Sequence, residues 1–95
     1  MKINIHTLPY GLTEVLKLNP VAYNWIDEND PQNKIGLIAQ EVKKIIPEVV
    51  IGKEENDTLG MNYAEMVPVL INAIQQLKIK VDGLRKKAKE LQLID

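Results

Sequence analysis

The sequence predicts an α+β fold, in which a small mixed head of short strands, hairpins and short helices precedes a long C-terminal helix. In the last third of the chain, apolar residues recur at alternating steps of three and four, which is typical of a coiled-coil seam. Upstream, two pairs of short segments, each pair separated by a polar stretch, favour two hairpins. A chain of 95 residues, 45% hydrophobic and 26% charged, has the size of one domain. We expect a head at 1–62 and a helical segment at 63–95.

Local patterns predict the elements of the head. Met1–Ile5 alternates apolar and polar residues, which indicates a short strand or an extended segment. Pro20 and Pro47 each end a short amphipathic helix. Asn62, with Glu65 three residues later, is a variant of the capping box and predicts the start of the last helix. The other expected elements are a helix at Leu12–Leu18, a hairpin of Val21–Ile26 and Lys34–Ile38, a helix at Gln40–Ile46, and a hairpin of Glu48–Lys53 and Thr58–Asn62.

Aromatic residues are scarce, with no Phe, one Trp and three Tyr in the chain. The predicted core is therefore aliphatic. We expect Trp25 and Tyr23 to supply its large anchors, buried against the helix around Val42 and Ile46.

The last helix carries the strongest pattern in the sequence. Its apolar residues occupy the a and d positions of four heptads, a narrow seam rather than a broad globular face. The seam consists of Val67, Leu70, Ile74, Leu77, Val81, Leu84, Ala88 and Leu91.

The length of this helix implies a partner. A helix from Tyr63 to Leu93 is roughly 46 Å long at 1.5 Å per residue, whereas a compact chain of this size is about 32 Å across. The head is therefore too small to cover the distal half of the seam, Val81 to Leu91. The alternative is that the seam packs on the head or on a crystal neighbour and has no biological partner.

The distal heptads are weaker than the proximal ones. Their e and g positions are Lys78, Lys80, Arg85 and Lys87, so parallel copies would place like charges opposite one another. Gly83 lowers helix stability by about 1 kcal/mol relative to Ala. β-Branched residues at a with Leu at d favour a parallel dimer.

Charge is divided unevenly along the chain, whose net charge is −1. Residues 1–77 carry −4 and residues 78–95 carry +3. A basic tail suggests an alternative function, a regulatory or nucleic-acid-binding coiled coil. Its basic residues spread around the helix rather than along one stripe, and no aromatic residue lies among them to stack on bases. They are Lys78, Lys80, Arg85, Lys86, Lys87 and Lys89.

Residue types that catalyse reactions or bind metals are few. The chain has no Cys and no Ser, and His6 is its only His, which excludes a Ser-His-Asp triad and His-based metal sites. The segment from Asp27 to Asp30 lacks the Gly and distal Glu of a calcium loop, and Glu54 to Asp57 is interpreted as a solvated hairpin tip. We expect no cofactor, no metal, no small-molecule ligand and no membrane span, since no apolar run approaches about 20 residues.

Three segments together resemble the intramolecular chaperone auto-processing domain. The most specific is Ile35-Gly36-Leu37-Ile38-Ala39-Gln40-Glu41-Val42 followed by Ile46-Pro47-Glu48-Val49-Val50, which is similar to the family signature IGFIAQEV…PELV. The segments 12–25 and 63–77 are similar to the family's helix-then-strand stretch and to the start of its final helix. This domain ends phage tailspikes, tail fibres and endosialidases, and also occurs in bacterial surface fibres and an animal membrane-bound transcription factor.

The resemblance implies a homotrimer that helps an upstream fibre chain to fold and then releases itself. It also implies a virion tail fibre or tailspike precursor made in the bacterial cytoplasm, or a bacterial surface fibre. Members cut before the Ser of a Ser-Asp-x-Arg-Leu-Lys motif, with the Lys as general base. Lys2 matches that Lys and Met1 stands at the Leu position, so the Ser would precede residue 1. Because a Lys base needs a hydroxyl within reach, we expect no self-cleavage from this chain. Nucleic acid is an expected partner only under the alternative function.

Overall fold

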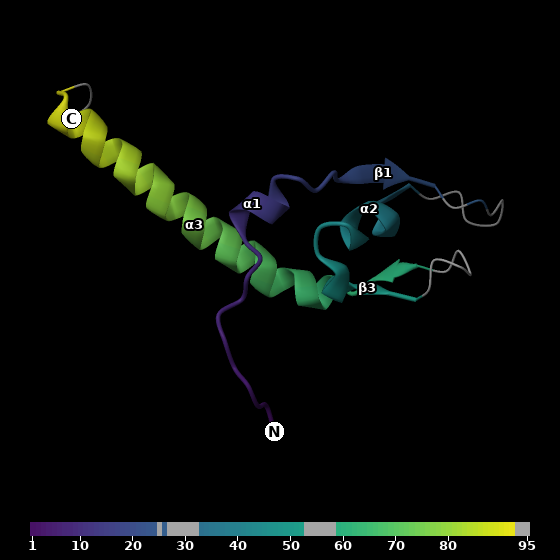
Figure 1. Cartoon of the computed structure of the whole chain (residues 1–95). Coiled ribbons are helices and arrows are strands. Elements are labelled where there is room, and N and C mark those ends of the chain that lie inside the picture. Colours follow the sequence, from purple (N-terminus) through teal and green to yellow (C-terminus); the bar gives the residue numbers. More distant parts are fainter. Residues whose placement is uncertain (25, 27–32, 53–58, 93–95) are drawn as a thin grey trace.

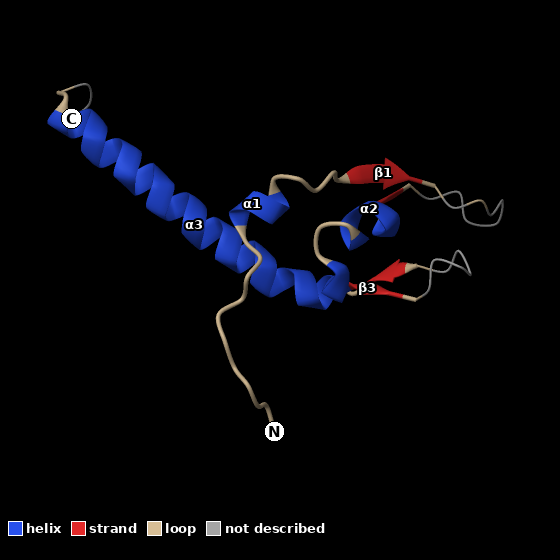
Figure 2. Cartoon of the chain, viewed as in Figure 1, coloured by secondary structure: helices blue, strands red, loops and turns tan. Residues whose placement is uncertain are grey.

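The short elements of the head gather around the first half of one long helix, whose second half projects away from them (Figure 1). The structure, a computed structural model, describes residues 1–24, 26, 33–52 and 59–92. The predicted α+β class is confirmed, with helices and strands mixed in the head (Figure 2). The elements are α1 (Leu12–Val15), β1 (Val21–Tyr23), β2 (Lys34–Gly36), α2 (Ala39–Lys43), the 3₁₀ helix η1 (Pro47–Val49), β3 (Val50–Ile51), β4 (Gly60–Met61) and α3 (Tyr63–Glu90).

Both predicted hairpins are present, each as a two-stranded antiparallel sheet. Val21 lies opposite Gly36 and Tyr23 opposite Lys34 in the first; Val50 lies opposite Met61 in the second. The strands are shorter than predicted, because a two-stranded ribbon is held only where its residues also pack on other elements. Predicted strand residues 25, 53 and 58 lie outside the described residues.

The N-terminal segment, residues 1–11, crosses α3 and then extends away from the head (Figure 1). Of the two forms predicted for Met1–Ile5, the extended segment is present and the strand is not. Asn4 adopts a positive φ of 53°, which breaks the alternation of faces that a strand requires. The ring Nδ1 of His6 lies 2.8 Å from the carbonyl oxygen of Asn4 and closes a local turn.

The two short helices form where predicted, but each ends three residues before its predicted C-terminal end. In α1, Leu12 is buried, whereas Leu16 lies beyond the helix and is 74% exposed. In α2, Val42 is buried, and the chain then turns towards Pro47. Pro47 begins η1, a position at which a missing backbone N–H costs nothing.

The core is formed where α2 and η1 meet the first turns of α3. Its cluster of buried residues is aliphatic, and Ile46 and Val42 are its least exposed members from the head. Tyr23 was predicted to be a buried anchor against these two residues, but it is half-buried and does not pack on the cluster. Tyr10 packs there instead. The prediction for Trp25 lies outside the described residues.

The start of α3 differs from the prediction in its cap. Asn62 is the N-cap residue, but its side chain makes no capping hydrogen bond, so the predicted capping box with Glu65 is wrong. The backbone N–H of Asn62 instead donates to the carbonyl of Val49 at 2.7 Å, which ties the helix start to the head. The helix continues through Pro68 and ends at Glu90, three residues before the predicted end.

Candidate functional site

Helix α3 presents two different faces. Met66, Val69 and Ala73 are its buried residues and pack against the head. The a and d residues lie on another face, and seven of these eight are between 42% and 68% exposed. The exposed set is Val67, Leu70, Ile74, Leu77, Val81, Leu84 and Leu91, with Ala88 intermediate. Within one chain, therefore, the seam does not fold back on the head.

The apolar face is widest near the head. Ile71, at an e position, is 49% exposed beside the a and d residues. Tyr63 occupies the d position one heptad before Leu70 and is also 49% exposed. An e position that is apolar as well as a and d gives a face broader than a two-helix seam requires. The proximal part of α3 is therefore an apolar surface suited to packing with other helices.

This surface continues onto the β1–β2 hairpin. Tyr63 lines an apolar groove of about 520 Å³ together with Pro20, Val21 and Leu37. Ile35, on the same groove, is 86% exposed. One continuous apolar surface thus runs from the hairpin along the seam. We call it the assembly surface, defined by Val21, Ile35, Tyr63, Ile71 and the a and d residues.

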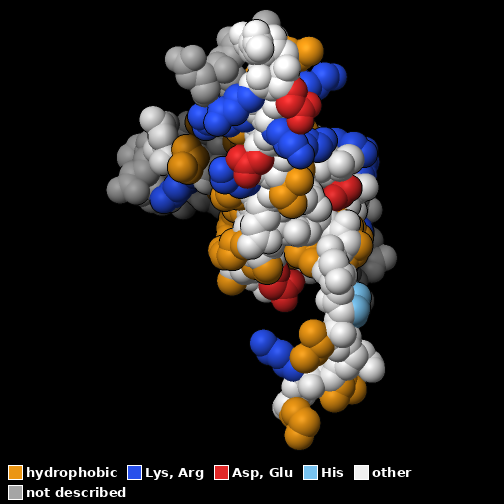
Figure 3. Space-filling view, turned by 90° about the vertical axis from the view of Figure 1, so that its left-hand side faces the viewer, with side chains coloured by type: hydrophobic (Ala, Val, Ile, Leu, Met, Phe, Trp, Pro, Cys, Tyr) orange, Lys and Arg blue, Asp and Glu red, His pale blue; other side chains and the backbone are white. Residues whose placement is uncertain are grey.

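The distal part of α3 is dominated by charge. Viewed from the C-terminal end of the helix, basic, acidic and hydrophobic side chains are intermixed rather than sorted into stripes (Figure 3). Lys78 and Asp82 form an ion pair of 2.7 Å across one helical turn, with both side chains more than half exposed. Such a pair contributes only a few tenths of a kcal/mol. A groove of basic residues that could follow a nucleic-acid backbone is not evident on the face shown.

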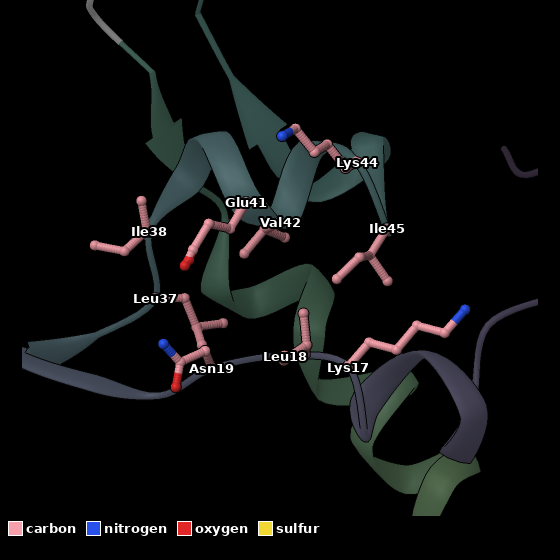
Figure 4. Close-up of a pocket in the computed structure, with 9 residues that line it drawn as sticks. All are labelled: Lys17, Leu18, Asn19, Leu37, Ile38, Glu41, Val42, Lys44 and Ile45. Carbon is pink, nitrogen blue, oxygen red and sulfur yellow. The ribbon is translucent and has the colours of Figure 1, made fainter.

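A second hollow in the head lies between α2 and the segment after α1 (Figure 4). It measures about 330 Å³, and its floor is formed by Leu18, Leu37, Val42 and Ile45. The amino groups of Lys17 and Lys44, its cationic lining residues, extend away from the floor (Figure 4). The other lining residues are Asn19, Ile38 and Glu41.

The predicted catalytic residue, Lys2, is exposed in the N-terminal segment. Of the three Thr residues, Thr7 and Thr13 are exposed and Thr58 lies outside the described residues. Among the described residues no group of His, Asp and Glu is placed to hold a metal ion. In the same part of the chain, no helix has both the length and the apolar character needed to cross a bilayer. The role of Lys2 stays a prediction.

Two polar residues of α3 that no sequence motif marks bond the backbone of the N-terminal segment and of the first residue of α1. Asn72 donates its Nδ2–H to the carbonyl of Tyr10 at 2.7 Å, and more weakly to that of Leu8 at 3.5 Å. Gln76 Oε1 accepts from the backbone N–H of Leu12 at 2.7 Å. The available signal was a pair of amides four residues apart, off the seam.

A second tie joins the start of α3 to the signature segment. The hydroxyl of Tyr63 accepts from the backbone N–H of Leu37 at 3.0 Å. Leu37 follows Gly36 in the segment that carries the most specific resemblance. The assembly surface is thus attached to the head at its first residue.

A comparison with known protein families matches the first half of the chain and does not extend to α3. The peptidase S74 family, described as the chaperone of endosialidase, matches residues 1–51, from the N-terminal segment to the end of β3. No curated protein and no solved structure matches the chain. The match covers more than half of the 95 residues and includes the signature segment at 35–50. The chain therefore belongs to the peptidase S74 family of self-cleaving chaperone domains.

Proposed function

We propose that this domain is a C-terminal assembly chaperone that joins three copies of a fibre or tailspike chain through the assembly surface. The observation that carries the proposal is the exposure of the a and d residues along a 28-residue helix. Burying such residues removes apolar area from water at roughly 25 cal/mol per Å². A chain that exposes them continuously gains free energy when copies of α3 pack together.

A trimer fits the assembly surface better than a dimer. The a and d residues alone favour two strands, but they account only for a narrow seam. Ile71 at e widens the face, and the groove beside Tyr63 adds apolar area on the head. Both features suit a helix that contacts two neighbours rather than one.

The chaperone role consists in aligning the chains of a fibre so that they pair and fold faster. Fibre chains that pair over long sequence separations fold slowly, because each non-local contact must first overcome loop-closure entropy. A C-terminal clamp holds the ends of three chains together and raises their effective concentration. In our proposal the upstream chain in cis is the partner. It is a virion tail fibre or tailspike precursor made in the bacterial cytoplasm, or a bacterial surface fibre.

In this form the domain acts without cleaving itself. Lys2 is the residue we assign as general base, and it needs a Ser hydroxyl to activate. The sequence contains no Ser. The proposal therefore separates two activities of the family: residues 1–95 carry the surface for assembly, and the Ser of the release motif would precede residue 1.

Substitution of one seam residue tests the proposal. Leu77 is 48% exposed at a d position in the middle of the seam. Leu77→Asp would bury three carboxylates at one level of a trimer, so we expect a monomer by light scattering after gel filtration. Gln75→Asp adds the same charge at an exposed position off the seam and should leave the mass unchanged. An unchanged mass for Leu77→Asp would contradict assembly through α3.

A further inference from the structure

Side chains of α3 bond the backbone of the N-terminal segment, in addition to the packing of Leu8 and Tyr10 on the core. Asn72 Nδ2 donates to the carbonyls of Tyr10, at 2.7 Å, and Leu8, at 3.5 Å. One helical turn later, Gln76 Oε1 accepts from the N–H of Leu12 at 2.7 Å. Successive backbone groups of one short segment are thus bonded to a single stretch of helix. The path of the segment is thereby set relative to α3.

The end of the Gln76 side chain packs closely on the backbone at Gly11. Gly11 is buried, and a Cβ on this residue would overlap Oε1 of Gln76. Leu12, next in sequence, is 9% exposed. Glu14 Oε1 accepts from the N–H of Gly11 at 2.8 Å and fixes the start of α1 from the other side. The segment therefore meets α3 at one defined place.

This contact lies on the opposite side of α3 from the assembly surface. At about 100° per residue, Asn72 and Gln76 project roughly away from the a and d positions. Along the helix axis, however, they lie level with Ile74 and Leu77, which are exposed seam residues. A neighbouring copy that covers the seam would leave the two amides bonded to the N-terminal segment.

We infer that Asn72 and Gln76 form an anchor that transmits the alignment of α3 to the N-terminal segment. The inference rests on the proposed function, because it takes copies to be aligned in parallel along α3. Copies in heptad register place their anchors at one height on the bundle, and a slip of one heptad would displace an anchor by about 10 Å. The segments that leave the anchors, residues 1–7, then start in register. Asn72 and Gln76 are positioning residues, since they act through the backbone of this segment.

Charge-matched variants can test the anchor. Asn72→Asp keeps the size of the side chain but replaces the donor with a carboxylate that faces two carbonyls, so it should release the segment. Gln76→Glu retains an acceptor for the N–H of Leu12 and should keep it in place. Both variants add one negative charge, on neighbouring turns of the same helix. A difference between them therefore reports hydrogen bonding rather than charge.

Distances between spin labels provide the readout, because the chain has no Cys and accepts labels at chosen positions. A label at Ile5→Cys, 83% exposed, reports distances between copies in the assembled protein. The pair Ile5→Cys and Lys86→Cys, diluted in unlabelled chain, reports the distance within one copy. We expect narrow distributions for the wild-type background and for Gln76→Glu. In Asn72→Asp both narrow distributions should be lost, with the mass of the assembly unchanged.

Each other outcome has a defined meaning. Narrow distributions that persist in Asn72→Asp would overturn the anchor, as would equal broadening in both variants. A wild-type protein that stays monomeric would overturn the proposed function and the alignment between copies. The distance within one copy would then still decide whether Asn72 anchors the segment.

Discussion

Position 36 is occupied by glycine because the Tyr63 side chain packs directly against this backbone. A Cβ at Gly36 would lie 2.5 Å from the hydroxyl of Tyr63, the atom that accepts from the N–H of Leu37. The glycine of the signature segment therefore allows the first residue of α3 to reach the backbone after β2. The signature makes this position recognisable in the sequence, but its partner, 27 residues later, is visible only in the fold.

Two glycine substitutions should change stability in opposite directions. Gly36→Ala pushes Tyr63 from its position and leaves the N–H of Leu37 without its partner, which should cost about 1–3 kcal/mol. Gly83 has open space around it within α3, so Gly83→Ala should stabilise by about 1 kcal/mol. Urea unfolding measures both changes. Equal effects of the two variants would contradict the packing of Tyr63 on Gly36.

Tyr10 supplies a pH-dependent contact. Its hydroxyl donates to Glu48 Oε1 at 2.7 Å. This hydrogen bond raises the pKa of Tyr10 above the ordinary value of 10.0, with smaller contributions from desolvation and from the charges of Glu48 and Glu14. Because the raised pKa favours the protonated phenol in the fold, the contact stabilises the protein at neutral pH. That contribution is lost as the pH rises through the pKa of folded Tyr10.

Glu48→Gln should lower the pKa of Tyr10 towards its ordinary value. Titration of phenolate absorbance in the wild type and the variant measures the difference. Glu65→Gln, an exposed acid in the first turn of α3, provides the control and should leave the titration unchanged. A titration curve that is the same for all three proteins would contradict the contact.

At the scale of elements, periodicity predicted α3 and its seam, because a step of 3 and 4 repeated over four heptads has no other structural origin. It did not reveal that Met66, Val69 and Ala73 form a separate face for the head. Those three positions are apolar too, and only the packed fold shows which apolar stripe the head covers. The hairpins were predictable from their strands, whereas the strand lengths depended on packing that local pattern does not encode.

The two faces of α3 can be separated by mutation. Met66 is 4% exposed in the core, so Met66→Ala should destabilise the fold by about 2–5 kcal/mol without changing the surface between copies. Leu70 is 42% exposed on the seam, so Leu70→Ala should weaken association and leave the unfolding of the isolated chain nearly unchanged. The free energy of unfolding, measured at low protein concentration, reports the first effect. The mass of the assembly, measured at high protein concentration, reports the second. Weakened association without destabilisation in Met66→Ala would show that the faces are assigned wrongly.

At the scale of the molecule, elongation is the main feature. The radius of gyration is 18.5 Å and the longest extent 59 Å, against about 12 Å for the radius of a compact chain of this length. The sequence predicted this elongation, because a helix of roughly 46 Å is longer than a compact chain of this size is wide, about 32 Å. It could not predict the crossing of the N-terminal segment over α3, which depends on two amides whose partners are backbone groups more than 60 residues away.

Sedimentation equilibrium at low and high salt tests the central claim, assembly through α3, most directly. The account predicts a species of three chain masses, each 10.8 kDa. It also predicts tighter association at high salt, because the basic e and g positions repel one another and salt screens them over about 8–10 Å at physiological strength. A single species of one chain mass at high protein concentration, under both conditions, would contradict it.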